Sequence, residues 1–189
     1  MIHGHQHFDS GQVIYHQGAG RSFAAVVQSG AVKLVQDEQV VGLALPGDYI
    51  GLGCLYESVQ IETAIALERS RVCLLHSESE LGQHAESVRL LAKEMQQKRW
   101  LTRIQQKPAR ARVCAWLIQI SEHHKSRGLS QDRFRLPLNR TDLGSYLGLA
   151  LETVSRLLTG LHNDGLIELH GREITILDRT ALSAESTAA

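Results

Sequence analysis

Residues 138–178 carry the side chains with the most specific chemistry in the chain, on the second of two short helical patterns that flank Gly148. One face of the predicted helix has polar residues at i, i+3, i+4 and i+7, namely Glu152, Ser155, Arg156 and Thr159. The opposite face is an apolar stripe of Val154, Leu157, Leu158 and Leu161. A carboxylate, a hydroxyl and a guanidinium within one turn are groups that read base edges in the major groove of DNA. The alternative is a plain surface ion pair between Glu152 and Arg156, which are spaced i, i+4.

The flanking residues predict how this helix is held. A short helical pattern precedes it: Asn139 can cap that helix, with Asp142 three residues on as an approximate capping box, and Gly148 allows the turn between the helices. Residues 166–177 have the alternation of a β-hairpin. Together these features predict a winged helix-turn-helix. The small, polar tail after Leu182 is expected to be frayed.

The residues before position 77 have the pattern of a small all-β domain. Short apolar runs alternate with glycine-containing turns, and the predicted strands are residues 13–16, 23–27, 31–35, 40–45, 63–67 and 71–76. Many short strands at about ten-residue spacing are typical of a small barrel or sandwich.

The period changes to that of one long helix over residues 78–107, and Pro108 fits the start of the next helix. The long helix carries an apolar stripe that includes Val88, Leu91, Met95 and Leu101. A long helix with one apolar seam and polar flanks favours a partner helix, so we expect a homodimer through these side chains. Packing of the helix on its own β domain is the alternative.

Composition limits the class of protein. The formal net charge of the 189 residues is zero, so the chain as a whole is no polyelectrolyte. Positive charge instead gathers around the predicted reading helix, because residues 109–160 hold eight Lys/Arg against four Asp/Glu. Cys54, Cys73 and Cys114 lie far apart, which indicates reduced thiols and a cytoplasmic protein. The sequence shows no signal peptide and no membrane-spanning run.

Taken in order, these motifs resemble bacterial transcription regulators of the CRP/FNR family, and above all its FNR-like branch. SGQVIYHQG, VVQSGAVKLV and LPGDYIGLGCLYES resemble the family's effector β-roll, residues 138–167 its helix-turn-helix, and HGREITILD its wing. The resemblance implies an α+β fold: a cupin-like β-roll in residues 1–77, a dimerisation helix in 78–107 and a winged helix-turn-helix in 108–189. It further implies a cytoplasmic homodimer that binds double-stranded DNA, with RNA polymerase as a partner and no enzyme activity.

The resemblance also implies which side chains meet DNA. In the FNR-like branch a Glu and a Ser-Arg pair read the half-site TTGAT, and those positions here are Glu152, Ser155 and Arg156. The expected site therefore resembles TTGAT-N4-ATCAA. The chemistry agrees independently, because Arg156 can pair with guanine O6 and N7 and Glu152 can accept from a cytosine amine. Leu151 can touch a thymine methyl group. The residues expected at the DNA backbone are Asn139, Arg140, Thr141, Thr153 and Arg172.

The effector positions of the resemblance are altered. The family's cyclic-nucleotide sensors use a Glu after the β-roll glycine and an Arg for the phosphate, but here Leu52 follows Gly51 and the Arg position falls on Glu62. A carboxylate repels a phosphate, so no tight cyclic AMP binding is expected. FNR itself holds a [4Fe–4S] cluster through an N-terminal cysteine group and one β-roll cysteine. Only Cys73 matches that set, so no such cluster is expected.

The N-terminal histidines leave other functions open. His3, His5 and His7 alternate and can bind a transition metal or haem iron, which would suit a metal or haem sensor or a cupin-like metalloenzyme. Against the enzyme, these histidines precede the first predicted strand instead of lining the barrel. Cys54 and Cys73 are the candidates for a redox-sensitive thiol, although burial as small apolar residues is the simpler expectation for both.

Overall fold

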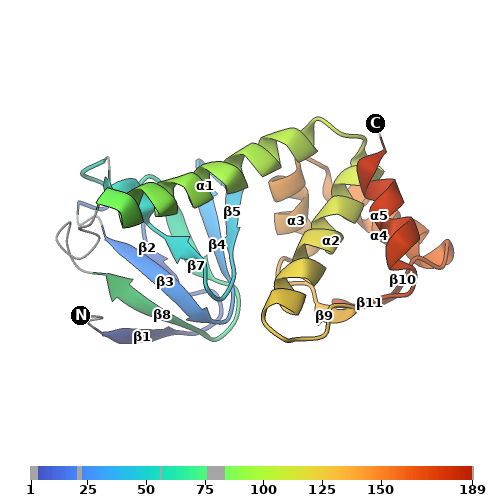
Figure 1. Ribbon diagram of the computed structural model, residues 1–189, viewed down its shortest axis with the longest axis horizontal. Coiled ribbons are helices and arrows are strands. Elements are labelled where there is room, and N and C mark those ends of the chain that lie inside the picture. Colours follow the sequence, from blue (N-terminus) through green and yellow to red (C-terminus); the bar gives the residue numbers. More distant parts are fainter. Residues whose placement is uncertain (1–3, 21–22, 56, 76–83, 189) are drawn as a thin grey trace. The chain divides into compact units, whose positions relative to one another are not determined.

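The computed structural model describes residues 4–20, 23–55, 57–75 and 84–188 (Figure 1). The chain divides into two compact units, Met1–Lys98 and Arg99–Ala189, and the boundary falls inside helix α1 (His84–Gln105). The first unit consists of β-strands and the first part of α1, and the second consists of helices with a small sheet, so the predicted α+β class is confirmed.

The N-terminal unit is a β-roll of two antiparallel four-stranded sheets. The first, of order β1-β8-β3-β6, consists of β1 (His5–Phe8), β8 (Ser70–Leu75), β3 (Ala24–Ser29) and β6 (Tyr49–Ile50). The second, of order β2-β7-β4-β5, consists of β2 (Val13–Tyr15), β7 (Thr63–Ala66), β4 (Val32–Gln36) and β5 (Gln39–Ala44). A short 3-10 helix, η1 (Leu52–Leu55), follows β6. Inward-facing residues of both sheets, such as Val27, Val32 and Val72, form one apolar core.

The six predicted strands are confirmed, each within two residues of its expected ends, but β1 and β6 are additional. The expectation that the histidines precede the first strand is therefore wrong, because His5 and His7 lie in β1. This edge strand pairs with β8, with His5 opposite Cys73. Its sequence, HQHF, has a single apolar residue, Phe8, which packs against the core. Backbone pairing to β8 thus forms a strand that hydrophobic alternation does not indicate.

Helix α1 carries the side chains predicted at the dimer seam. Met95 is 53% exposed, while Leu91 and Leu101 are half-buried. The side chain of Val88 lies outside the described residues. Met95 therefore keeps an apolar side chain in solvent within the single chain, as the predicted seam requires. The division of the chain at positions 77 and 107 remains a prediction.

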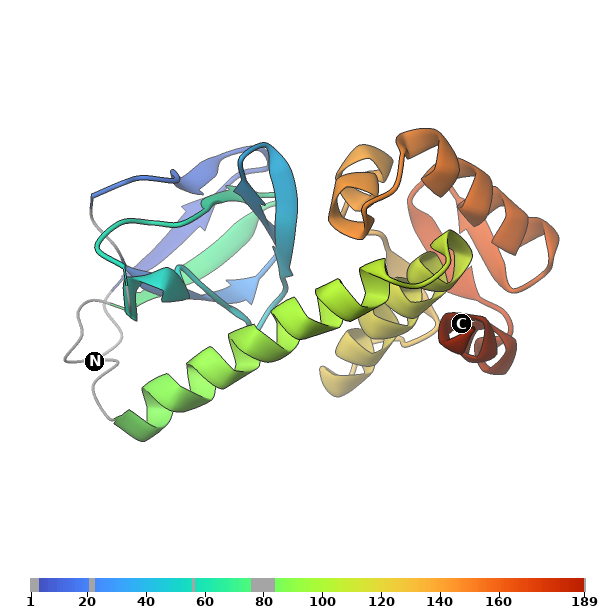
Figure 2. The ribbon, with the colours of Figure 1, turned by 90° about the horizontal axis from the view of Figure 1, so that it is seen from above.

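The C-terminal unit is a winged helix-turn-helix (Figure 2). Its helices are α2 (Ala109–Ser126), α3 (Arg140–Leu147), α4 (Leu151–Asn163) and α5 (Arg179–Thr187). Its sheet, of order β10-β11-β9, consists of β9 (Arg133–Arg135), β10 (Ile167–His170) and β11 (Glu173–Ile176). The core gathers fully buried side chains from each layer, including Trp116, Leu147, Leu158 and Ile174. Large buried side chains of this kind dominate the stability of a small domain.

The expectation of a frayed tail after Leu182 is wrong, because α5 continues to Thr187. Asp178 caps its first turn, Leu182 is fully buried, and Arg179 pairs with Glu122 of α2. The residues of α5 are small and polar, so local sequence gives little sign of this helix. Its stability comes from packing on α2, which is a contact between residues distant in sequence.

Candidate nucleic-acid interface

Helix α3, the first of the helix-turn-helix, begins and ends as predicted. Asn139 Oδ1 accepts a hydrogen bond from the N–H of Asp142 at 2.8 Å, and Asn139 Nδ2 donates to Asp142 Oδ2 at 2.9 Å. The helix ends at Gly148, whose φ of 65° is in the left-handed region that favours glycine. These two positions fix where α3 stops and the turn to α4 begins.

The turn brings α3 into close contact with the residues that lead into α4. A Cβ atom on Gly144 would lie 2.6 Å from the carbonyl oxygen of Leu149, which is shorter than any ordinary carbon–oxygen contact. The obstacle is backbone and cannot rotate away. Glycine at position 144 therefore allows the close approach that sets the start of α4.

Helix α4 is anchored by its apolar side. Val154, Leu158 and Leu161 are fully buried, and Leu157 is half-buried. Burial of each leucine contributes about 1.5–3 kcal/mol relative to exposure. The predicted apolar stripe is thus confirmed, and it fixes which side of α4 faces away from the domain.

The opposite side of α4 faces solvent. Leu151 is 42% exposed, Glu152 and Arg156 are exposed, and Thr153 and Ser155 are half-buried. Within the described part of the chain, the Glu152 carboxylate and the Arg156 guanidinium form no ion pair with each other or with another side chain. The plain surface ion pair is therefore absent, and both groups keep their full hydrogen-bonding capacity for a partner.

Residues expected at the DNA backbone lie in the first turns of α3 and α4. Thr141 is exposed and Arg140 half-buried at the start of α3, and Thr153 lies in the first turn of α4. The first N–H groups of a helix have no partner within the helix, and its dipole favours an anion there. These positions are suited to phosphate. Asn139 is exposed too, but its side-chain amide is engaged in the cap.

Arg172, also expected at the DNA backbone, is engaged within the domain. Its Nε and Nη2 donate to the carbonyl oxygen of Leu136 at 3.1 Å and 2.7 Å, and Nη2 donates to that of Pro137 at 2.7 Å. The guanidinium thereby links the turn between β10 and β11 to the chain after β9. A phosphate contact by Arg172 remains a prediction, and these hydrogen bonds compete with it.

Arg112 of α2 has no local sequence signal, yet it holds the end of α3. Its Nη1 donates to the carbonyl oxygens of Leu147 at 3.1 Å and Gly148 at 3.2 Å. Gln105 of α1 adds a hydrogen bond from Nε2 to the carbonyl oxygen of Tyr146 at 3.1 Å. Carbonyls at a helix end lack partners in their own helix, and a cation there is favourable. The helix-turn-helix is thus tied to the α1–α2 junction by residues that are distant in sequence.

The polar side chains at the effector positions of the β-roll are buried, unlike those on the exposed side of α4. Glu62, where the resemblance places a phosphate-binding arginine, is 7% exposed and accepts a hydrogen bond from Tyr15 Oη at 2.9 Å. Gln60 is fully buried, and its Nε2 donates to the carbonyl oxygen of Phe23 at 2.9 Å. At this position the roll presents a buried carboxylate instead of a cation.

In the part of the chain that the structure describes, His5 and His7 are not grouped with other side chains that could bind a metal ion. His5 and His7 are exposed on β1, and His3 lies outside the described residues. Among the residues that the structure describes, no group of three or more His, Cys, Asp or Glu side chains could hold a metal ion. Metal or haem binding by these histidines remains a prediction from the sequence.

The described cysteines are buried. Cys73 is fully buried, as expected for a small apolar residue, and so is Cys114. Burial raises the pKa of the Cys114 thiol to about 11, so this thiol stays protonated at neutral pH. The side chain of Cys54 lies outside the described residues. Because a [4Fe–4S] cluster takes four thiolates, the described residues do not fit one.

The fold and this surface define a winged helix-turn-helix DNA-binding protein that also has an N-terminal β-roll domain. The chain matches the cyclic nucleotide-binding domain family over residues 5–81 and the Crp-like helix-turn-helix domain family over residues 111–185. The two matches follow the order of the two units described above.

Relatives of the whole chain agree. The transcriptional activator protein FnrA of Stutzerimonas stutzeri is 34% identical over 187 residues, which cover 92% of this chain and 77% of FnrA. The transcriptional activator protein anr of Pseudomonas aeruginosa is 33% identical with the same coverage. The solved structure of FixK2 from Bradyrhizobium japonicum is 27% identical, covers 100% of both chains and gives a TM-score of 0.84. The chain belongs to the CRP/FNR family of transcription regulators.

Membership in this family decides between the classes of function left open by the sequence. The chain is a DNA-binding transcription regulator of a non-enzymatic family, so the cupin-like metalloenzyme is not favoured. In the described part of the chain, no helix is both long and apolar enough to cross a membrane.

Proposed function

We propose that the chain acts as a homodimer that reads an inverted repeat similar to TTGAT-N4-ATCAA. The observation that carries this proposal is the solvent-facing side of α4, where Glu152 and Arg156 are exposed and unpaired among the described residues. An unpaired carboxylate and guanidinium one turn apart are suited to neighbouring base edges. The same side of α4 begins at Leu151, at the N-terminal end that enters the groove first in helix-turn-helix proteins.

Each side chain on this face has a distinct role in the proposal. Arg156 pairs bidentately with O6 and N7 of the half-site guanine, and Glu152 accepts a hydrogen bond from a cytosine N4 amine. Ser155 bonds a base edge or a phosphate, and Leu151 packs on a thymine methyl group. These contacts specify sequence, because they are made to atoms that differ between base pairs.

A second group of residues binds the DNA backbone and carries no sequence preference. Arg140 and Thr141 at the start of α3, with Thr153 in α4, meet phosphates through their side chains and the free N–H groups of the helix starts. Asn139 contributes through its position at the cap of α3, and Arg172 contributes where its internal hydrogen bonds allow. Loss of such a contact weakens binding to all sequences alike.

The homodimer follows from the inverted repeat. A two-fold site needs two α4 helices about 34 Å apart, one in each of two successive major grooves. The predicted seam on α1, with Met95 exposed and Leu91 and Leu101 half-buried, supplies an apolar surface for a second copy. Val88 belongs to the same predicted stripe.

The test measures DNA binding by fluorescence anisotropy, and oligomeric state by light scattering after gel filtration. The expected result is a dimer that prefers TTGAT-N4-ATCAA to a scrambled duplex of equal composition. A matched duplex with the half-sites moved apart by about five base pairs turns one of them to the opposite face of DNA, so it should bind far more weakly. A monomer with equal affinity for all three duplexes would refute the proposal.

The effector is proposed to be neither cyclic AMP nor a [4Fe–4S] cluster. The buried carboxylate of Glu62 and the buried Leu52 support the first statement, and the burial of Cys73 supports the second. The check is that cyclic AMP changes neither the unfolding temperature nor DNA affinity. We expect RNA polymerase as a further partner, since the relatives above are named transcriptional activators, and a cytoplasmic location follows from the need to reach DNA.

A further inference from the structure

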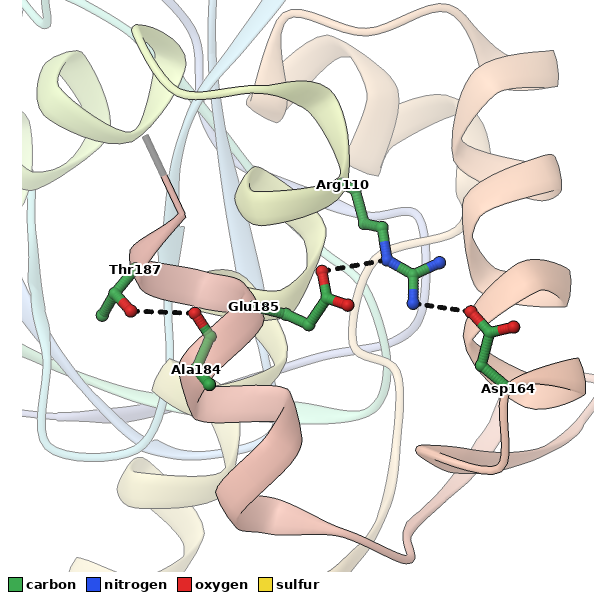
Figure 3. Close-up of polar contacts among 5 residues, drawn as sticks. All are labelled: Arg110, Asp164, Ala184, Glu185 and Thr187. Atoms are coloured by element: carbon green, nitrogen blue, oxygen red, sulfur yellow. Dashed lines mark hydrogen bonds and ion pairs between the residues drawn. The ribbon is translucent and has the colours of Figure 1, made fainter.

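Arg110, the second residue of α2, lies between the end of α4 and the C-terminal helix α5 (Figure 3). Its Nη2 donates to Asp164 Oδ2 at 2.6 Å, and its Nε donates to Glu185 Oε2 at 3.1 Å. A Cβ atom on Gly160 would lie 3.7 Å from the remaining nitrogen, Nη1. The guanidinium therefore bonds the end of α4 and α5 through two of its nitrogens, and Nη1 lies near Gly160 of α4.

The charges of this cluster are placed where each alone is unfavourable. Asp164 is the C-cap residue of α4, at the negative end of the helix dipole, whereas Arg110 belongs to the first turn of α2, at a positive end. Their pairing brings a cation to the end of α4. Burial alone lowers the pKa of Arg110, but hydrogen bonds to Asp164 and Glu185 raise its pKa above the ordinary value. The guanidinium is thus charged wherever the protein is folded.

The α5 side of the cluster is held independently of Arg110. Leu182 of α5 is fully buried, and Lys107 Nζ donates to the carbonyl oxygen of Ser186 at 3.1 Å. In the last turn, Thr187 Oγ1 donates to the carbonyl oxygen of Ala184 at 2.8 Å (Figure 3). Glu185 is therefore a carboxylate on a docked helix, and it gives Arg110 a fixed support.

We propose that Arg110 is a positioning residue for DNA reading, which fixes the C-terminal end of α4 through Asp164 and connects it to α5 through Glu185. The inference rests on the proposed reading of DNA by α4. The start of α4 is set by Gly144 and by the end of α3, and burial of its apolar side holds the helix as far as Leu161. Beyond Leu161 the helix end is exposed, and Asp164 is the side chain through which Arg110 holds it. The cluster fixes the second end, so α5 takes part in DNA reading without touching DNA.

The test compares Arg110→Ala, Asp164→Asn and Glu185→Gln in the full-length protein, with Lys125→Ala as a control. Lys125 is an exposed cation in the last turn of α2, so its loss changes the net charge as Arg110→Ala does. Two quantities are measured. One is amide hydrogen exchange without DNA over residues 160–166, where the N–H of Asp164 bonds the carbonyl of Gly160 at 2.9 Å. The other is affinity for TTGAT-N4-ATCAA and for a scrambled duplex at several salt concentrations.

Arg110→Ala and Asp164→Asn should each raise exchange in residues 160–166 and weaken specific binding by about threefold to tenfold, as expected for a half-exposed ion pair present in both subunits. Glu185→Gln should also raise exchange in residues 160–166 and weaken specific binding, but by less than Arg110→Ala does. The salt dependence should keep its slope, because Arg110 is proposed to touch no phosphate.

Several results would overturn the assignment. If hydrogen exchange is unchanged in Arg110→Ala, Arg110 does not hold the end of α4. If it is unchanged in Glu185→Gln, α5 has no part in holding it. An equal loss of affinity in Lys125→Ala, or a flatter salt dependence in Arg110→Ala, would make the residue a plain contributor of charge. If the wild-type chain has no sequence preference, the proposed function fails, and the exchange measurement still decides whether Arg110 holds α4.

Discussion

The polar groups of α4 and those inside the β-roll are used in opposite ways. Glu152 and Arg156 are exposed and unpaired among the described residues, whereas Glu62 is 7% exposed and bonded to Tyr15. The two α4 side chains therefore have no partner of their own in the described chain, while Glu62 in the roll accepts a hydrogen bond from Tyr15. The difference supports the proposal that DNA is recognised on the exposed side of α4, and that Glu62 acts in the structure of the roll.

The largest effect is expected from a change that displaces α4 and leaves its exposed side chains as they are. Gly144→Ala places a Cβ atom 2.6 Å from the carbonyl oxygen of Leu149. Overpacking typically lowers the free energy of unfolding by about 1–3 kcal/mol, and a clash with backbone should lie near the upper limit of this range. We expect a lower unfolding free energy, measured by urea denaturation, and loss of DNA binding. The matched control is Gly160→Ala in α4, whose Cβ would meet its nearest neighbour at an ordinary 3.7 Å. Equal effects of the two changes would show that the α3–α4 contact has no special role.

The second prediction separates residues proposed to contact bases from residues proposed to contact the DNA backbone. Arg156→Ala should cost about 1–3 kcal/mol of binding free energy and relax the preference at the half-site guanine, because a bidentate base contact is lost. Arg140→Ala should weaken binding to all sequences alike and flatten the salt dependence. Anisotropy titrations with duplexes substituted at the guanine measure both. If Arg156→Ala lowers affinity without altering the preference, α4 does not read that base.

The same comparison explains which parts of the molecule the sequence predicts. The helix-turn-helix is specified locally: the apolar period of α4, the cap at Asn139 and the left-handed Gly148 all act within a few residues. The sequence alone could therefore predict which side chains of α4 face solvent. The alternative, a surface ion pair between Glu152 and Arg156, is not formed among the described residues.

What the sequence does not predict depends on distant partners. Strand β1 forms by pairing with β8, and α5 forms by packing on α2. Arg172 has the residue type of a phosphate contact, yet its guanidinium bonds the carbonyls of Leu136 and Pro137. The Arg112 link to the end of α3 spans 35 residues. Each of these needs the folded chain before its partner is known.

The third prediction tests the roll side of the comparison. Tyr15→Phe removes the hydroxyl that donates to Glu62 and leaves a buried carboxylate with one donor fewer, which costs about 1–2 kcal/mol. Urea denaturation should show lower stability, while the affinity for TTGAT-N4-ATCAA at a temperature where the variant is folded should stay at the wild-type value. A loss of DNA affinity as large as that of Arg156→Ala would show that this pair does more than hold the roll together.

The smallest expected effect concerns His124, which lies in the last turn of α2 beside the ring of Phe134, with ring centroids 5.4 Å apart. Burial lowers the pKa of the His124 imidazole below its ordinary value of 6.5. The unfolded chain therefore takes up a proton at a pH where the folded chain does not. The contribution to stability is complete above the unfolded pKa and is lost as the pH falls below it. We expect the unfolding temperature to fall between pH 7.5 and pH 5.5, and this fall to be smaller in His124→Gln. A pH profile that His124→Gln leaves unchanged would assign the effect to other groups.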